Sequence, residues 1–123
     1  TTGREEDAVD QLATLMLLRL GERGGFAAIA SAEAFALEHD EQDEEDVPLW
    51  DEHALDLQRM YEGMCLIYGS NPTQFKGLVG KDGLPKERAE NCEETFKATA
   101  RSWDGLLKPH LKRPGGLRFT LPE

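Results

Sequence analysis

The sequence predicts a mainly α-helical fold, a compact bundle of about five helices with a short extended C-terminal tail. Apolar residues recur at helical spacing in several long segments, and glycine or proline residues separate these segments. Only the last few residues alternate in the manner of a strand. The chain has 123 residues, which suits one domain because a single core typically takes about 100–150 residues. We therefore expect residues 1–123 to form a single helical domain.

The first predicted helix covers residues 4–20. Beyond its first turn it is apolar on nearly every side, which is typical of a helix buried at the centre of a bundle. Gly21, Gly24 and Gly25 are expected to end it. A second helix is expected over residues 26–37, where small alanine side chains favour close packing against a neighbouring helix.

Residues 39–46 read HDEQDEED and are predicted to form a polar loop. The segment lacks the glycine and the ligand spacing of an EF-hand. A solvated loop is therefore the first interpretation, and a weak calcium site in residues 40–46 is the alternative.

Three further helices are expected in the second half of the chain. Residues 51–68 have helical spacing and Gly69 follows as a natural stop. A short helix is predicted over residues 71–79, with proline in its first turn, and a longer one over residues 86–107. Residues 117–121 alternate apolar and polar side chains, which fits either one short strand or an extended arm.

The charge balance excludes some classes of partner. There are 24 acidic and 14 basic residues, so the net charge is −10, and this argues against nucleic-acid binding, which needs a basic face. The longest apolar run, residues 15–18, is far too short to cross a bilayer. The chain begins at Thr1 without an initiator methionine, so we expect that processing or the chosen boundaries removed the true start. The oligomeric state does not follow from the sequence.

Cys65 and Cys92 are the only cysteines in the sequence. They could form a disulfide, remain buried thiols, or belong to a metal site, but no CxxC motif or nearby Cys/His cluster supports structural zinc. A buried thiol would explain Cys65, which has apolar neighbours, but not Cys92, which has acidic ones. A disulfide explains both, and it would place the protein in an oxidising compartment, either the periplasm, the cell envelope or the exterior.

Glu6 and Asp10 carry the pattern that points most clearly to chemistry. They are four residues apart, so they lie on one stripe of the first helix. If that stripe faces the interior, the carboxylates need a cation, with Glu6 as a metal ligand and Asp10 bonded to a neighbouring ligand. An alternative needs no metal, because acidic residues in a first helical turn interact favourably with the helix dipole. Asp10 lies beyond that turn and is explained less well.

Three stretches of the chain carry a family resemblance. They are GREEDAVDQLATLMLL, DEHALDLQRMYEGMCLIYGSNP, and LPKERAENCEETF followed by ARSWDGLLKPHL, and they cover most of residues 3–111 in order. Together they resemble a bacterial family of unknown function regarded as metallopeptidases, similar to gluzincin-type zinc peptidases. In that family an HExxH motif precedes the GREED segment. The resemblance implies that its histidines bind zinc, that its glutamate is the general base, that Glu6 is the third protein ligand, and that Asp10 orients a zinc-bound histidine.

This chain departs from the family pattern because it contains no HExxH motif. Its histidines are His39, His53 and His110, and no two are spaced i, i+4. Glu6 alone cannot hold zinc, which needs three or four ligands. We therefore expect the chain to be the zincin-like C-terminal portion of a domain whose HExxH segment lies upstream, and to be inactive and without zinc when isolated. The alternative is a degenerate family member that never had the motif.

The resemblance also suggests an oxyanion-stabilising residue. In zinc peptidases a histidine or tyrosine outside the metal ligands commonly takes this role, and His53 lies inside the matched stretch, with Tyr61 as a second candidate. Arg59 could pair with Asp56 or Glu62, or with a carboxylate elsewhere in the fold. The first functional hypothesis is an exported zinc metallopeptidase acting on a peptide or protein substrate. The second is a non-catalytic helical interaction domain stabilised by a disulfide.

Overall fold

The computed structural model describes residues 3–44, 50–80, 83–113 and 116–120. This part of the chain is mainly helical and contains no strand, so the predicted all-α class is confirmed. Its elements are α1 (Gly3–Leu18), α2 (Glu22–Glu44), α3 (Trp50–Ser70), α4 (Lys86–Ala89) and α5 (Cys92–Leu107), with single 3-10 turns η1 (Lys76–Leu78) and η2 (Lys108–His110). An isolated bridge between Val79 and Leu84 pairs the two sides of the turn before α4.

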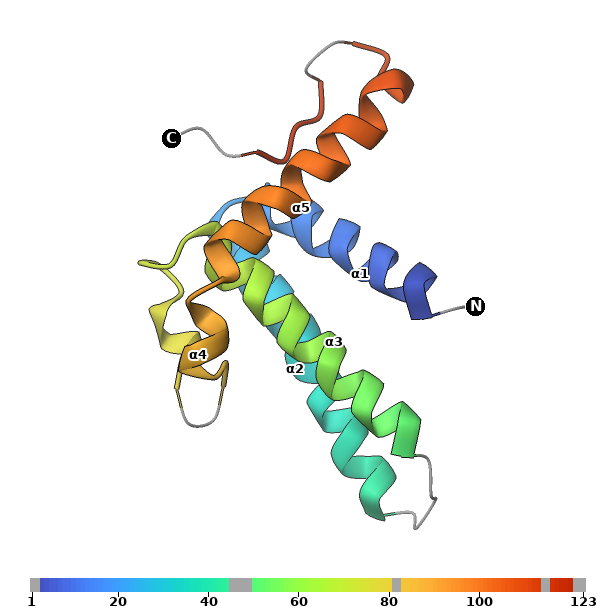
Figure 1. Cartoon of the computed structure of the whole chain (residues 1–123), viewed down its shortest axis with the longest axis vertical. Coiled ribbons are helices and arrows are strands. Elements are labelled where there is room, and N and C mark those ends of the chain that lie inside the picture. Colours follow the sequence, from blue (N-terminus) through green and yellow to red (C-terminus); the bar gives the residue numbers. More distant parts are fainter. Residues whose placement is uncertain (1–2, 45–49, 81–82, 114–115, 121–123) are drawn as a thin grey trace.

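Helix α3 is the centre of the arrangement. It runs beside α2 in a long antiparallel hairpin, while α1 and α5 extend from one end of that hairpin in different directions (Figure 1). Helices α1, α2, α4 and α5 all contact α3. Every other described α-helix therefore depends on α3 for part of its burial.

The prediction that the first helix is buried at the centre is wrong. Among the side chains of α1 that the structure describes, from Ala8 onward, only Leu15 is fully buried, whereas Val9 and Met16 are 67% and 51% exposed. The face around Leu15 packs against Leu66 of α3 and Phe96 of α5. The opposite face is apolar in sequence, but no described segment covers it.

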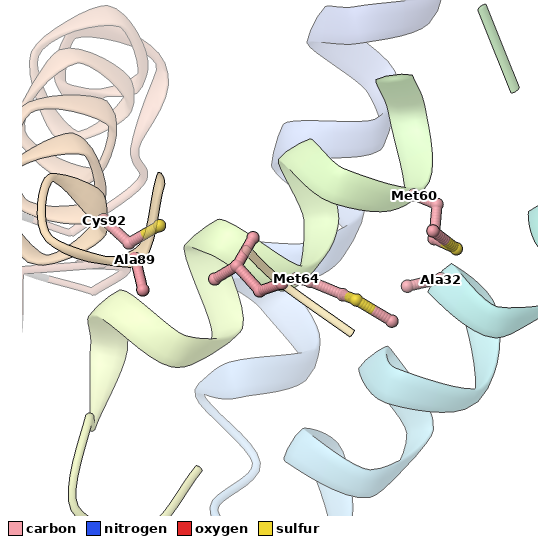
Figure 2. Close-up of a cluster of buried hydrophobic side chains, with 6 residues drawn as sticks. Ala32, Met60, Met64, Ala89 and Cys92 are labelled. Atoms are coloured by element: carbon pink, nitrogen blue, oxygen red, sulfur yellow. The ribbon is translucent and has the colours of Figure 1, made fainter. Parts of the chain in front are cut away.

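Two sides of α3 carry the core. Figure 2 shows Met60 and Met64 of α3 directed toward Ala32 of α2, with Ala89 and Cys92 gathered on the other side of the helix. All five side chains are at least nine-tenths buried. Burial on both sides makes α3 the element on which the remaining helices are positioned.

The predicted disulfide is confirmed. Cys65 of α3 is bonded to Cys92 at the start of α5, across a Cα–Cα distance of 5.0 Å. The predicted fifth helix divides at Glu90 and Asn91 into α4 and α5, and this break brings the beginning of α5 against α3. Gly69 fits the same contact, because a Cβ atom there would lie 2.1 Å from the carbonyl oxygen of Cys92. Gly69 therefore lies inside α3 as a close-packing residue and does not stop it.

The glycines after α1 have different roles from those predicted. Gly21 has a φ of +80° and does end α1, as expected for a left-handed C-terminal glycine. Gly24 and Gly25 lie in α2 instead. A Cβ atom on Gly24 would lie 1.7 Å from the carbonyl oxygen of Leu17, so this glycine permits the close crossing of α1 and α2.

Two predicted boundaries are wrong. Helix α2 continues through Glu44, so residues 39–44 are helical and not a loop. Glutamate and glutamine are good helix formers, which favours the longer helix. The side chains of residues 40–46, the alternative calcium site, lie outside the described part. The helix predicted over residues 71–79 is a series of turns ending in η1, in which Oδ1 of Asn71 accepts a hydrogen bond from the N–H of Gln74.

The C-terminal tail is an extended arm and not a strand. Phe119 is 2% exposed and packs in the cluster with Leu15 and Phe96. The Asp104 carboxylate accepts hydrogen bonds from the backbone N–H groups of Phe119 (2.6 Å) and Thr120 (3.1 Å) and from the Thr120 hydroxyl (2.9 Å). Burial alone would raise the pKa of Asp104, but these bonds and the charge of Arg118 outweigh it and lower that pKa. Leu121 lies outside the described residues.

Candidate functional site around Asp10 and Arg59

The backbone of α1 places Glu6 and Asp10 one turn apart on the same stripe of the helix. The side chain of Asp10 is 28% exposed and lies on the side of α1 that faces α3. The side chain of Glu6 lies outside the described part of the structure. At Asp10 the stripe is therefore partly buried against α3. A favourable interaction with the helix dipole, the alternative that needs no metal, does not explain this burial.

Asp10 is held by Arg59 of α3. The Arg59 guanidinium donates through Nε to Oδ2 of Asp10 at 2.6 Å and through an Nη nitrogen to Oδ1 at 3.0 Å. Both side chains are about three-quarters buried, and they come from positions 49 residues apart. A bidentate pair of this kind fixes the plane of the carboxylate more firmly than a single contact does. Each carboxylate oxygen keeps a second lone pair that can accept another donor.

Arg59 contacts a carboxylate elsewhere in the fold, which is one of its predicted alternatives. It binds the distant carboxylate of Asp10, and the nearby Glu62 accepts a hydrogen bond from Gln58 at 3.1 Å. The side chain of Asp56 lies outside the described part. Sequence spacing favours partners three or four residues away, so nothing local singled out Asp10.

The residue after Asp10 joins α1 to α5. The indole N–H of Trp103 donates to Oε1 of Gln11 at 3.4 Å, and the Trp103 ring packs against the cluster that contains Leu15. Helix α1 is thus attached to α3 through Asp10 and to α5 through Gln11. Both contacts lie within one turn of the Glu6–Asp10 stripe.

A hollow of about 340 Å³ opens beside this pair. Gln11 of α1 lines it, together with Glu62, Cys65 and Leu66 of α3, Arg88 of α4, and Asn91, Thr95 and Thr99 at and within α5. Neither Asp10 nor Arg59 lines the hollow, but Gln11 follows Asp10 and Glu62 lies one turn after Arg59, so the hollow and the pair share the same part of α1 and α3. No sequence pattern predicts this hollow, because its lining residues come from four separate segments.

The two oxyanion candidates are placed on α3. His53 lies in the first turn of that helix, and its side chain is outside the described part. Tyr61 is half-buried, and its ring stacks against the Arg88 guanidinium, with the guanidinium carbon 5.3 Å from the ring centroid. Tyr61 is therefore engaged in packing between α3 and α4.

The described residues do not form a complete metal site. Among them, no three His, Cys, Asp or Glu side chains come together in a way that could hold an ion. Zinc needs three or four ligands, and the Asp10 carboxylate is already paired with Arg59. The donor set in this part of the chain thus does not by itself fit zinc.

Comparison with known protein families matches residues 1–107 to a family described as "Putative metallopeptidase". The match includes α1 to α5 and therefore all of the residues that form the site. No curated protein and no solved structure gives a significant match. Within the described part of the chain, no helix is long and apolar enough to cross a membrane.

Proposed function

The chain belongs to the family described as "Putative metallopeptidase", as the match over residues 1–107 shows, and we propose that it is the helical part of a zinc-dependent peptidase that hydrolyses peptide bonds with metal-activated water. The observation that carries the proposal is the Asp10–Arg59 pair, which fixes a carboxylate on the stripe that also holds Glu6. An oriented and ionised carboxylate is what a metal-bound histidine requires as the acceptor for its second N–H.

The proposal gives each predicted site residue a role. Glu6 is a zinc ligand, and Asp10 orients a zinc-bound histidine from an HExxH segment that precedes Thr1. His53 stabilises the oxyanion that forms as water attacks the peptide carbonyl. The substrate is a peptide or protein, and the Cys65–Cys92 disulfide supports an oxidising, exported location.

A second function is supported by a different observation. Val9 and Met16 on α1 and Leu20 in the turn after it are all more than half exposed, and an exposed apolar face suits an interaction domain that has no catalytic role. In that case the disulfide and the ion pair only maintain the fold. If the metallopeptidase proposal holds, the upstream HExxH segment would cover this apolar face of α1. Exposure of the face is therefore compatible with both functions.

Activity of the protein extended upstream of Thr1 separates them. The proposal predicts hydrolysis of a casein-derived peptide mixture that a chelator abolishes and added zinc restores. His53→Ala should lower kcat by roughly 10²-fold or more with little change in KM, because oxyanion stabilisation acts in the transition state. His110→Ala, which alters an exposed histidine in η2, is the control. Absence of zinc-dependent hydrolysis would favour the interaction domain.

A further inference from the structure

One wall of the hollow, which we call the trough, is a row of residues that begins at the N-cap of α5. Asn91, Thr95 and Thr99 line it at intervals of four residues, so they form one stripe along α5. A helix rises about 1.5 Å per residue, which places the ends of this stripe about 12 Å apart. An extended peptide rises about 3.3 Å per residue, so the trough matches three or four peptide residues.

The lining suits a peptide backbone. Leu66 and Cys65 supply apolar surface, and the Thr99 hydroxyl and the Asn91 amide can donate and accept hydrogen bonds. The Thr95 hydroxyl donates to the Asn91 carbonyl oxygen at 2.9 Å and can still accept a hydrogen bond. An extended chain presents one donor and one acceptor at nearly every residue and needs such mixed partners. The trough thus offers what a short peptide requires along its whole length.

The two ends of the trough differ. Gln11 lies at the end that adjoins Asp10, while Arg88 and Asn91 lie at the other end, where α5 begins. Stacking on Tyr61 holds the Arg88 guanidinium, and no carboxylate in the described part of the chain forms an ion pair with it. The N-terminal end of the 16-residue helix α5 favours negative charge, but Glu93 and Glu94 in its first turn already supply it, so Arg88 is the group available to an added anion. The Arg88 end is therefore prepared to receive an anion.

We propose that this hollow is a peptide-binding trough that holds three or four residues of extended chain and receives a carboxylate at Arg88. The carboxylate is either the free C-terminus of the peptide or an acidic side chain. If the proposed peptidase function holds, on which this part of the inference rests, the scissile bond lies near the Gln11 end and the carboxylate follows it by about three residues. Peptide binding itself does not depend on a metal.

The test uses the 123-residue chain and N-acetylated tetra-alanine as the probe, with affinity measured by calorimetry or by NMR shifts of Thr95 and Thr99. The free-acid peptide should bind at least roughly tenfold more tightly than its C-terminal amide, because the amide removes a charged hydrogen-bond partner. A third probe carries glutamate as its last residue and ends in an amide. If the glutamate probe binds as tightly as the free acid, the trough accepts any carboxylate. If its affinity equals that of the amide, the trough recognises the C-terminal carboxylate specifically.

Variants identify the residue that responds. Arg88→Gln should remove the difference between free acid and amide, Arg88→Lys should keep part of it, and Arg101→Gln on the exposed face of α5 should leave it intact. Glu62→Gln should tighten binding of the free acid by roughly two- to fivefold, because it removes a like charge from the trough. Thermal unfolding of each variant shows that it is folded before binding is measured.

Two outcomes would overturn the inference. One is equal affinity for the free-acid and amide peptides, or no binding of either. The other is a preference for the free acid that survives in Arg88→Gln. Neither outcome tests zinc binding. If the 123-residue chain binds peptides but the extended protein shows no zinc-dependent hydrolysis, the trough proposal stands and the peptidase proposal fails.

Discussion

Helix α3 and helix α1 are both rich in apolar residues, but the fold uses them differently. In α3 the apolar side chains are covered on two sides, by α2 and by the disulfide-linked start of α5. In α1 one face packs around Leu15 and the other leaves Val9 and Met16 more than half exposed. The comparison shows that stability is concentrated around α3, whereas the proposed chemistry lies on α1, where Arg59 of α3 holds Asp10.

The largest expected effect comes from the α3 side of this comparison. Replacing both Cys65 and Cys92 with alanine should lower the free energy of unfolding by ~3–4 kcal/mol, because the disulfide restricts the unfolded chain. Urea denaturation of this double variant and the wild type measures the loss. A change below about 1 kcal/mol would mean that packing around α3 holds α5 in place without the covalent bond.

The two faces of α1 should respond very differently to the same kind of truncation. Leu15→Ala should cost about 3 kcal/mol, because Leu15 is 2% exposed and its removal leaves a cavity between α1, α3 and α5. Met16→Ala is the matched control on the open face and should cost less than about 0.5 kcal/mol. Equal losses, measured by chemical denaturation, would show that the open face is covered in solution.

The Asp10–Arg59 ion pair between α1 and α3 should contribute less to the free energy of unfolding than the disulfide or the packing of Leu15. A double-mutant cycle with Asp10→Asn and Arg59→Gln should give a coupling energy of about 1 kcal/mol, because the pair is bidentate but about one-quarter exposed to solvent. High salt should reduce this coupling. Strict additivity of the two substitutions would show that the pair does not form in solution, and would remove the observation on which the role of Asp10 depends.

The smallest effect concerns Asp104 and the tail. Because the folded-state pKa of Asp104 is lowered, its hydrogen bonds add stability above the pKa of an unfolded aspartate, about 4, and this contribution is lost as the pH falls through the folded pKa. Asp104→Asn should therefore be less stable than wild type at neutral pH and should approach it in acid. Glu94→Gln, an exposed change on α5, should show no such convergence when unfolding is followed against pH.

The features that were predicted correctly are those that the local sequence determines, above all the positions of the helices. The spacing of apolar residues located α1 and α3 to within a few residues and predicted the end of α5, and the contrast between the neighbours of Cys65 and Cys92 predicted their disulfide. The same periodicity overstated the burial of α1, because it reports which residues are apolar and not which segments cover them. Packing also decided that Gly69 and Gly24 lie inside helices, since each meets backbone from another element.

The site was less predictable than the fold. Spacing alone indicated Glu6 and Asp10, because both lie on one helix. Their surroundings depend on pairs such as Asp10 with Arg59 and Gln11 with Trp103, whose members are 49 and 92 residues apart. No local pattern selects one partner over another at such separations, so the trough and its Arg88 end emerged only from the folded chain.

The most direct test of the proposed function is the zinc content of the protein extended upstream of Thr1. Inductively coupled plasma mass spectrometry should find one zinc per chain in the wild type and nearly none in Glu6→Gln. Glu5→Gln, with the same change one position earlier and off the Glu6–Asp10 stripe, should keep its zinc. Full zinc occupancy in Glu6→Gln would contradict the ligand assignment, and a wild type without stoichiometric zinc would contradict the peptidase proposal itself.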